Sequence, residues 1–139
     1  MDRTWSDASQ GLWPSFFRYW APVIGYASLI FYFSSLSHPE ERLPDFLIKQ
    51  ISDKLLHLAE YGVLSGLCYR AFRWAAGPSA AGRAVLLAIL VASAYALTDE
   101  VHQWFVPLRE ASWMDWVADT IGAAIGAVGW SRFMNKAEG

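Results

Sequence analysis

The chain has 139 residues, of which 55% are hydrophobic, 16% aromatic and only 17% charged. This composition is too apolar for an ordinary small soluble domain, and it predicts a compact integral membrane protein with a single domain over residues 1–139. The formal net charge of −2 leaves no basic stripe for phosphates, so nucleic acid is excluded as an expected partner. Cys68 is the only cysteine, which rules out an intrachain disulfide.

The N-terminal residues do not resemble a cleavable signal peptide. The residues up to Gly11 are mostly polar, and they are followed by a cluster of aromatic residues rather than by a short apolar segment. We therefore expect residues 1–11 to form a short polar tail at the membrane surface. A first transmembrane helix is expected over residues 16–36, since no charge occurs from Tyr19 to Leu36 and the run can cross a hydrocarbon core of about 30 Å. Pro22 would then lie in its first turns. Residues 37–45 are expected to form a loop, with room for a short surface helix after Pro44.

Three further transmembrane helices are expected over residues 53–76, 84–105 and 113–133, which makes the fold class an all-α bundle of four transmembrane helices. Ser52 is a suitable N-cap for the first of them, and a Gly-Pro pair at 77–78 follows its end. Pro107 is expected to end the next helix, and Ser112 to cap the last. Gly122 and Gly126 form a GxxxG pattern, which allows a neighbouring helix to approach closely.

Ionisable side chains interrupt these apolar helices, where each is costly unless it is paired. Three of the helices carry acids at a similar depth, which predicts a shared polar cavity rather than three separate exposures to lipid. Arginines are concentrated at the chain termini and between the second and third helices, so the positive-inside rule places both termini in the cytoplasm and the cavity facing outward. The candidate ligand-binding residues are Asp53, Lys54, His57, Glu60, Tyr61, Asp99, Glu100, His102, Gln103, Arg109, Asp115 and Asp119.

Several motifs together resemble the VanZ-like family of small bacterial membrane proteins, over about residues 33–128. They are Ser34-Ser35, Asp53-Lys54-Leu55-Leu56-His57 with Tyr61, Asp99-Glu100-Val101-His102-Gln103, Arg109, Ser112, Asp115 and the Gly122/Gly126 helix. Leu108 stands where the family usually has Gly in a Pro-Gly-Arg turn, and Asp119 stands where Asn is usual. The resemblance implies a role in the cell envelope, and the founding member is linked to resistance to the glycopeptide teicoplanin.

The polar residues support more than one interpretation. Asp99, Glu100, Asp115 and Arg109 form either a salt-bridge network that fixes two helices or a ligand site, and Arg109 suits a bidentate carboxylate or phosphate. His57 and the nearby acids could ligate a metal, but no closed spacing motif is present, and we expect no metal and no cofactor. Lys54 is interpreted as interfacial. Trp104, Trp113 and Trp116 are interpreted as an interfacial belt.

Two functions of different classes follow from these residues. The first is an envelope protein in the bacterial cytoplasmic membrane that contacts membrane lipids and binds an amphiphilic cell-wall-related ligand. A lipid-linked precursor or a lipoglycopeptide would be such a ligand, and the protein would contribute to teicoplanin tolerance. The alternative is a membrane enzyme that acts on a lipid-linked headgroup through clustered carboxylates and His57. A proton-coupled transporter would require oligomerisation, because four helices are too few for the usual repeats.

Overall fold

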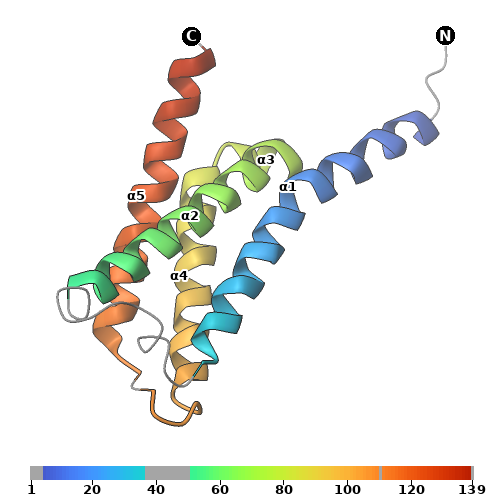
Figure 1. The fold of residues 1–139 in the computed structure, drawn as a ribbon. Helices are drawn as coiled ribbons and strands as arrows, with labels where there is room; N and C mark the ends of the chain where they lie inside the picture. The colour runs from blue at the N-terminus through green and yellow to red at the C-terminus, as the bar shows by residue number, and fades with distance from the viewer. Residues whose placement is uncertain (1–4, 37–50, 110, 139) are drawn as a thin grey trace.

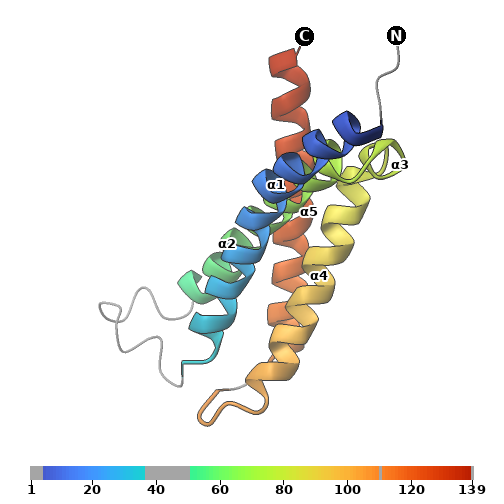
Figure 2. The same ribbon diagram turned by 90° about the vertical axis from the view of Figure 1, so that its right-hand side faces the viewer.

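The computed structural model describes residues 5–36, 51–109 and 111–138, and these residues are helical apart from short connections. The helices are α1 (Trp5–Ser34), α2 (Ile51–Ala75), α3 (Pro78–Ala81), α4 (Ala84–Gln103) and α5 (Trp113–Glu138). The expected all-α class is therefore confirmed, with the four-residue α3 added where the chain turns between α2 and α4. The start of α1, α3 and the end of α5 lie at one end of the molecule, and the α4–α5 connection lies at the other (Figures 1 and 2).

Helix α1 differs most from its expected form. It begins at Trp5, so the expected polar tail is wrong for residues 5–11, which are helical. Pro22 consequently lies well inside the helix rather than in its first turns, and Pro14 is internal as well. Proline removes a backbone donor and crowds the preceding turn, which bends a helix. Helix α1 changes direction along its length (Figure 1).

The other helix ends follow the expected breakers to within a few residues. Helix α2 begins at Ile51, so Ser52 lies inside the helix and is not its N-cap. Helix α4 ends at Gln103, short of Pro107, because the chain passes into turns before the proline is reached. Ser112 immediately precedes α5, and its carbonyl accepts the backbone N–H groups of Asp115 and Trp116. The expected loop at 37–45 and the surface helix after Pro44 lie outside the described residues.

Helix α2 is the centre of the bundle, since it contacts α1, α4 and α5 and packs most extensively against α5. The contact with α5 is close because both helices present glycine. A Cβ added at Gly122 would overlap the Leu58 carbonyl, and one added at Gly126 would overlap the Gly62 carbonyl. The expected close approach at Gly122 and Gly126 is thus confirmed, and its partner surface is Gly62 and the Leu58 backbone on α2.

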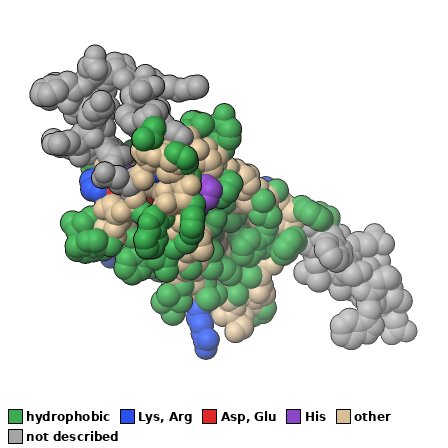
Figure 3. Space-filling model, turned by 90° about the horizontal axis from the view of Figure 1, so that it is seen from below, with side chains coloured by type: hydrophobic (Ala, Val, Ile, Leu, Met, Phe, Trp, Pro, Cys, Tyr) green, Lys and Arg blue, Asp and Glu red, His purple; other side chains and the backbone are tan. Residues whose placement is uncertain are grey.

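The core between these helices is built from small residues and a few aromatic rings. Ala88, Ala92 and Ala96 follow one face of α4 at intervals of four residues, and each is fully buried. Large hydrophobic side chains such as Ile24, Leu90 and Ile125 point outward instead. Hydrophobic side chains make up much of the coloured surface in Figure 3, which views the molecule from the end that carries the α4–α5 connection. Four acidic side chains are therefore among the buried groups, whereas many of the large apolar ones are outside.

Among the described residues, α4 is long and apolar enough to cross a membrane. Helices α2 and α5 carry ionisable residues that lower their average hydropathy, and Asp115 and Asp119 of α5 are buried in the bundle.

Candidate functional site

The most buried part of the candidate site joins α2, α4 and α5. A ring nitrogen of His57 and carboxylate oxygens of Glu100 and Asp119 lie within 4.8 Å of one another. Nδ1 of His57 is 3.1 Å from Oδ1 of Asp119, which is only 1% exposed. We call these three residues the histidine–carboxylate group. Their positions depend on the glycine contact between α2 and α5, because His57 and Asp119 each lie within one helical turn of it.

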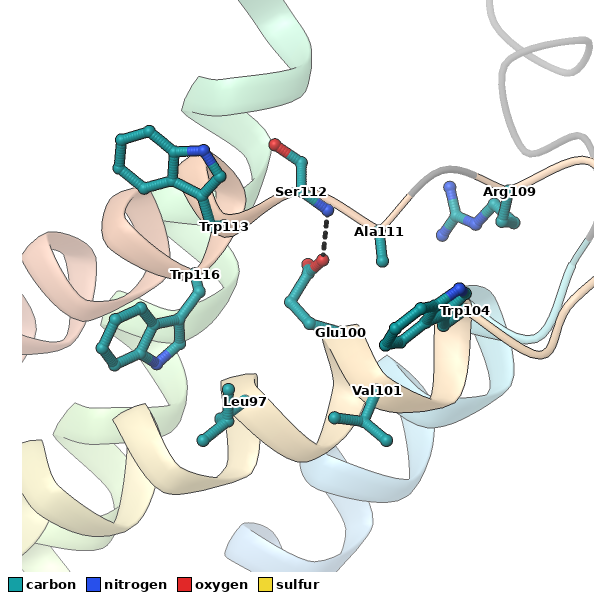
Figure 4. Close-up of a pocket in the computed structure, with 9 residues that line it drawn as sticks. All are labelled: Leu97, Glu100, Val101, Trp104, Arg109, Ala111, Ser112, Trp113 and Trp116. Atoms are coloured by element: carbon teal, nitrogen blue, oxygen red, sulfur yellow. Dashed lines mark hydrogen bonds between the residues drawn. The ribbon is translucent and has the colours of Figure 1, made fainter.

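Glu100 extends from α4 toward the first turn of α5 (Figure 4). Its Oε2 accepts the backbone N–H of Ser112 at 2.8 Å, so it satisfies a donor at the start of α5. Its Oε1 is buried without a hydrogen-bond partner among the described residues. The carboxylate as a whole is 6% exposed. Glu100 therefore fixes the α4–α5 connection with one oxygen and leaves the other available to a bound group.

Lys54 and Asp115 form an ion pair between α2 and the start of α5. The side chain of Lys54 is about half exposed, whereas Asp115 is buried. The interpretation of Lys54 as merely interfacial is incomplete, because its ammonium group compensates a buried acid. The partner of Asp115 is thus a lysine on another helix, which spacing along the chain does not indicate.

A second group of polar side chains joins α4 to the end of α1. Nε2 of Gln103 donates to Ser34 Oγ and to Asp99 Oδ2, at 3.1 Å in each case. Nε2 of His102 is 3.0 Å from Ser35 Oγ. Asp99, His102 and Gln103 thus lie on the side of α4 that faces the end of α1. Ser34 and Ser35, which were not among the candidate residues, are their partners, and the adjacent Ser-Ser pair was the available signal.

Arg109 lies beside two hollows of different size. A small inner pocket of about 70 Å³ is lined by Ser34, His57, Glu60, Asp99, Gln103 and Arg109 together with three apolar side chains. A larger cleft of about 670 Å³, which we call the tryptophan cleft, is lined by Leu97, Glu100, Val101, Trp104, Arg109, Ala111, Ser112, Trp113 and Trp116 (Figure 4). Arg109 is the residue common to both linings. Its half-buried guanidinium leaves Nε without a partner among the described residues.

The tryptophans of the cleft differ in their surroundings. Trp104 and Trp113 are largely exposed, as the predicted interfacial belt requires. Trp116 is half-buried, and its Nε1 donates to the Ser93 carbonyl at 3.1 Å. Trp116 therefore holds α5 against α4 and forms a fixed wall of the cleft.

Leu108 precedes Arg109 and has a φ of 65°, the left-handed conformation. Among the described residues it is the one non-glycine with positive φ. A side chain at Cβ is strained there, because it approaches the following carbonyl oxygen. Position 108 is thus one that physically favours glycine.

Two further candidates have distinct outcomes. Tyr61 is fully buried, and its hydroxyl has no hydrogen-bond partner among the described residues, whereas the hydroxyl of Tyr95 donates to the Ala27 carbonyl at 2.7 Å. The backbone of Asp53 lies in α2, but its side chain is outside the described part of the molecule. The remaining ten candidates lie in the groups and pocket linings described above.

The chain belongs to the VanZ/LLP1 family, whose model matches residues 9–134. The match extends beyond both ends of the resemblance noted in the sequence and includes all the candidate residues. Comparison with curated proteins and with solved structures gave no match.

Proposed function

We propose that this protein is a multi-pass protein of the bacterial cytoplasmic membrane that binds the headgroup region of an amphiphilic, cell-wall-related ligand in the tryptophan cleft. The observation that carries the proposal is the composition of that cleft. Its walls are aliphatic and aromatic, and its charged groups are Glu100 and Arg109. Its volume of about 670 Å³ lies in the range of about 300–1,000 Å³ that is usual for small-ligand sites.

Membrane insertion is supported by the distribution of side chains. Helix α4 has the length and composition of a membrane span, and α1 has no charged residue from Tyr19 to its end at Ser34. Large apolar side chains are exposed on α1, α4 and α5, as expected where lipid rather than water surrounds the helices. The buried acids of α4 and α5 are turned away from that surface. Helices that contain acids can then lie in a bilayer, because the acids do not contact lipid.

The direction of the cleft follows from the cations. Arg70, Arg73, Arg83 and Arg132 lie toward the end that carries α3, and Lys54 and Arg109 lie toward the opposite end. By the positive-inside rule the α3 end faces the cytoplasm, and the tryptophan cleft opens near the outer surface. A ligand that arrives from the outer leaflet or the cell wall can then reach it.

An amphiphile fits this geometry with its apolar part beside Leu97, Val101 and Trp116 and its polar part toward Arg109. The Arg109 guanidinium would bind a phosphate or carboxylate of the ligand through paired N–H donors. Teicoplanin carries a fatty chain and vancomycin does not, so a site at the membrane surface discriminates between the two. This preference motivates the proposed contribution to teicoplanin tolerance.

The proposal is tested by expressing the protein in a susceptible bacterium and measuring minimal inhibitory concentrations of both antibiotics. We expect tolerance to rise more for teicoplanin than for vancomycin, and to be lost with Arg109→Ala at equal protein level. Arg83→Ala, at the opposite end of the molecule, is the matched control and should retain the effect. Unchanged tolerance with the parent protein would refute the resistance role, and tolerance that survives Arg109→Ala would refute the cleft as its cause.

Ligand binding is measured separately by native mass spectrometry of the detergent-purified protein with a lipid-linked cell-wall precursor. Loss of a hydrogen-bonded charged partner costs about 1.5–3 kcal/mol, so Arg109→Ala should weaken binding about tenfold or more. Equal binding by the parent and by Arg109→Ala would contradict the assigned orientation of the headgroup.

A second candidate function, a membrane enzyme acting on a lipid-linked headgroup, is favoured by the histidine–carboxylate group. His57 is oriented by Asp119 at 3.1 Å, and Glu100 is close to both, an arrangement suited to general acid–base chemistry. Release of a product from the lipid-linked precursor by purified protein, abolished by His57→Ala, would establish this function. Binding without turnover would leave the first proposal as the function.

A further inference from the structure

The interior of the bundle contains more negative than positive charge. Four buried carboxylates, those of Asp99, Glu100, Asp115 and Asp119, are each less than 10% exposed. Two cations lie among them in the described part of the chain, Lys54 on Asp115 and Arg109 beside Asp99 and Glu100. Ionised carboxylates in such surroundings need compensation, because burial removes their hydration. The imbalance is two charges, which one divalent cation would neutralise.

The unsatisfied atoms lie in the same region as this imbalance. Oε1 of Glu100 and Oδ1 of Asp99 are both buried and both lack a hydrogen-bond partner among the described residues. A well-packed protein rarely leaves acceptors of this kind unpaired. Glu100 also contributes an oxygen to the histidine–carboxylate group, within 4.8 Å of the ligand atoms of His57 and Asp119. The unpaired carboxylate therefore belongs to the group of residues that has the ligand types for a metal.

We propose that His57, Glu100 and Asp119 bind one divalent transition-metal ion of the Zn²⁺ type. One imidazole nitrogen and two carboxylate oxygens form a ligand set suited to such an ion, and three protein ligands leave a coordination position open. Arg109 lines one pocket with Glu100 and another with His57, and Lys54 pairs with Asp115.

The separations are compatible with coordination. Two ligand atoms at about 2.1 Å from one ion lie about 3.0–3.4 Å apart for bond angles between 90° and the tetrahedral value. The 3.1 Å between His57 Nδ1 and Asp119 Oδ1 agrees with this. All three ligand atoms lie within 4.8 Å of one another, so side-chain shifts of about 1–1.5 Å, for example in Glu100, would complete the site. A glutamate with three rotatable side-chain bonds can make this movement.

Asp119 has a particular part in this site. Residue 119 is an aspartate, and its anionic carboxylate is a stronger ligand for a divalent ion than a neutral amide would be. The inference is independent of the proposed ligand in the tryptophan cleft. Glu100 is common to the cleft and the metal site, but His57 and Asp119 do not line the cleft, and the metal site is tested without lipid or antibiotic.

The first experiment measures metal content. The full chain, purified in detergent and treated with a chelator, is incubated separately with Zn²⁺, Mn²⁺ and Mg²⁺, passed through a desalting column and analysed for metal and protein. We expect about one Zn²⁺ per chain and a higher melting temperature with Zn²⁺, because a ligand that binds the native state stabilises it. Glu100→Gln should weaken Zn²⁺ binding about tenfold or more. Glu60→Gln, a half-buried acid on the same helix as His57 but outside the ligand set, should not.

The second experiment identifies a ligand directly. In a Cys68→Ala background, Asp119→Cys should give the intense near-ultraviolet band of thiolate-to-metal charge transfer when Co²⁺ is added. Glu60→Cys in the same background is the control and should give no such band. A merely structural role for Asp119 does not produce this signal.

The proposal is overturned if the parent protein retains no stoichiometric Zn²⁺, or if only Mg²⁺ stabilises it. It is also overturned if Glu60→Gln and Glu100→Gln bind equally well. None of these results bears on antibiotic tolerance or on binding of the lipid-linked precursor, so failure here and failure of the proposed function can be told apart.

Discussion

The turn before Arg109 provides a direct test of the local backbone. Leu108 is in the left-handed conformation at φ 65°, and its side chain is 75% exposed, so it contributes little burial. The left-handed conformation costs a non-glycine residue about 1–2 kcal/mol. Replacing it with glycine removes this cost but adds about 0.5–1 kcal/mol of backbone entropy to the unfolded chain. Leu108→Gly should therefore stabilise the protein by about 0.5–1 kcal/mol.

The assay is thermal unfolding of the detergent-purified protein, followed by circular dichroism. For a chain of this size the expected stabilisation corresponds to a rise of a few degrees, about 2–4 °C. Leu108→Ala is the matched control, since it removes the exposed side chain but keeps Cβ and hence the strain. A melting temperature for Leu108→Gly that does not exceed that of Leu108→Ala would refute the assignment of strain to this residue.

Three further substitutions test other parts of the fold by the same assay. Gly126→Ala should destabilise the protein by about 1–3 kcal/mol, because its Cβ overlaps the Gly62 carbonyl, whereas Gly129→Ala meets nothing within 4 Å and should not. Tyr61→Phe should raise stability by about 1 kcal/mol by removing a buried hydroxyl without a described partner, and a loss would show that the hydroxyl has a bound partner. Tyr95→Phe should instead lower stability by about 1 kcal/mol, since its hydroxyl donates to the Ala27 carbonyl.

The helices were largely predictable because their signals are local. Long stretches without charge, the Gly-Pro pair at 77–78 and Ser112 before α5 all act within a few residues. The start of α1 was not predictable in this way. Residues 5–11 are mostly polar and include Gly11, a composition that predicts an irregular tail. In the structure they form the N-terminal turns of α1. Pro14 and Pro22 likewise lie within α1, where proline usually indicates an end.

The candidate site was predictable as a set of residues but not as a set of pairs. Acids at interior positions of apolar helices had to meet, because each is costly alone, and Asp99, Glu100, Asp115 and Asp119 are all buried. Which group meets which depends on the crossing of α2 over α5. The pairing of Lys54 with Asp115 and of His57 with Asp119 spans about sixty residues of chain in each case. Spacing rules along the chain do not extend that far, so the sequence did not indicate that Lys54 is the partner of Asp115.

The glycine contact explains why α2 and α5 can share buried charge at all. Side chains of ordinary size at Gly62, Gly122 and Gly126 would separate the two backbones, and the short side chains of His57 and Asp119 would then no longer meet. Glu100 reaches the same place from α4, and the Ser112 backbone N–H donates to one of its oxygens at the start of α5. The close packing of the helices and the polar site are therefore one feature of the structure. A substitution that widens the contact, such as Gly126→Ala, should lower metal binding as well as stability, even though it touches no ligand atom.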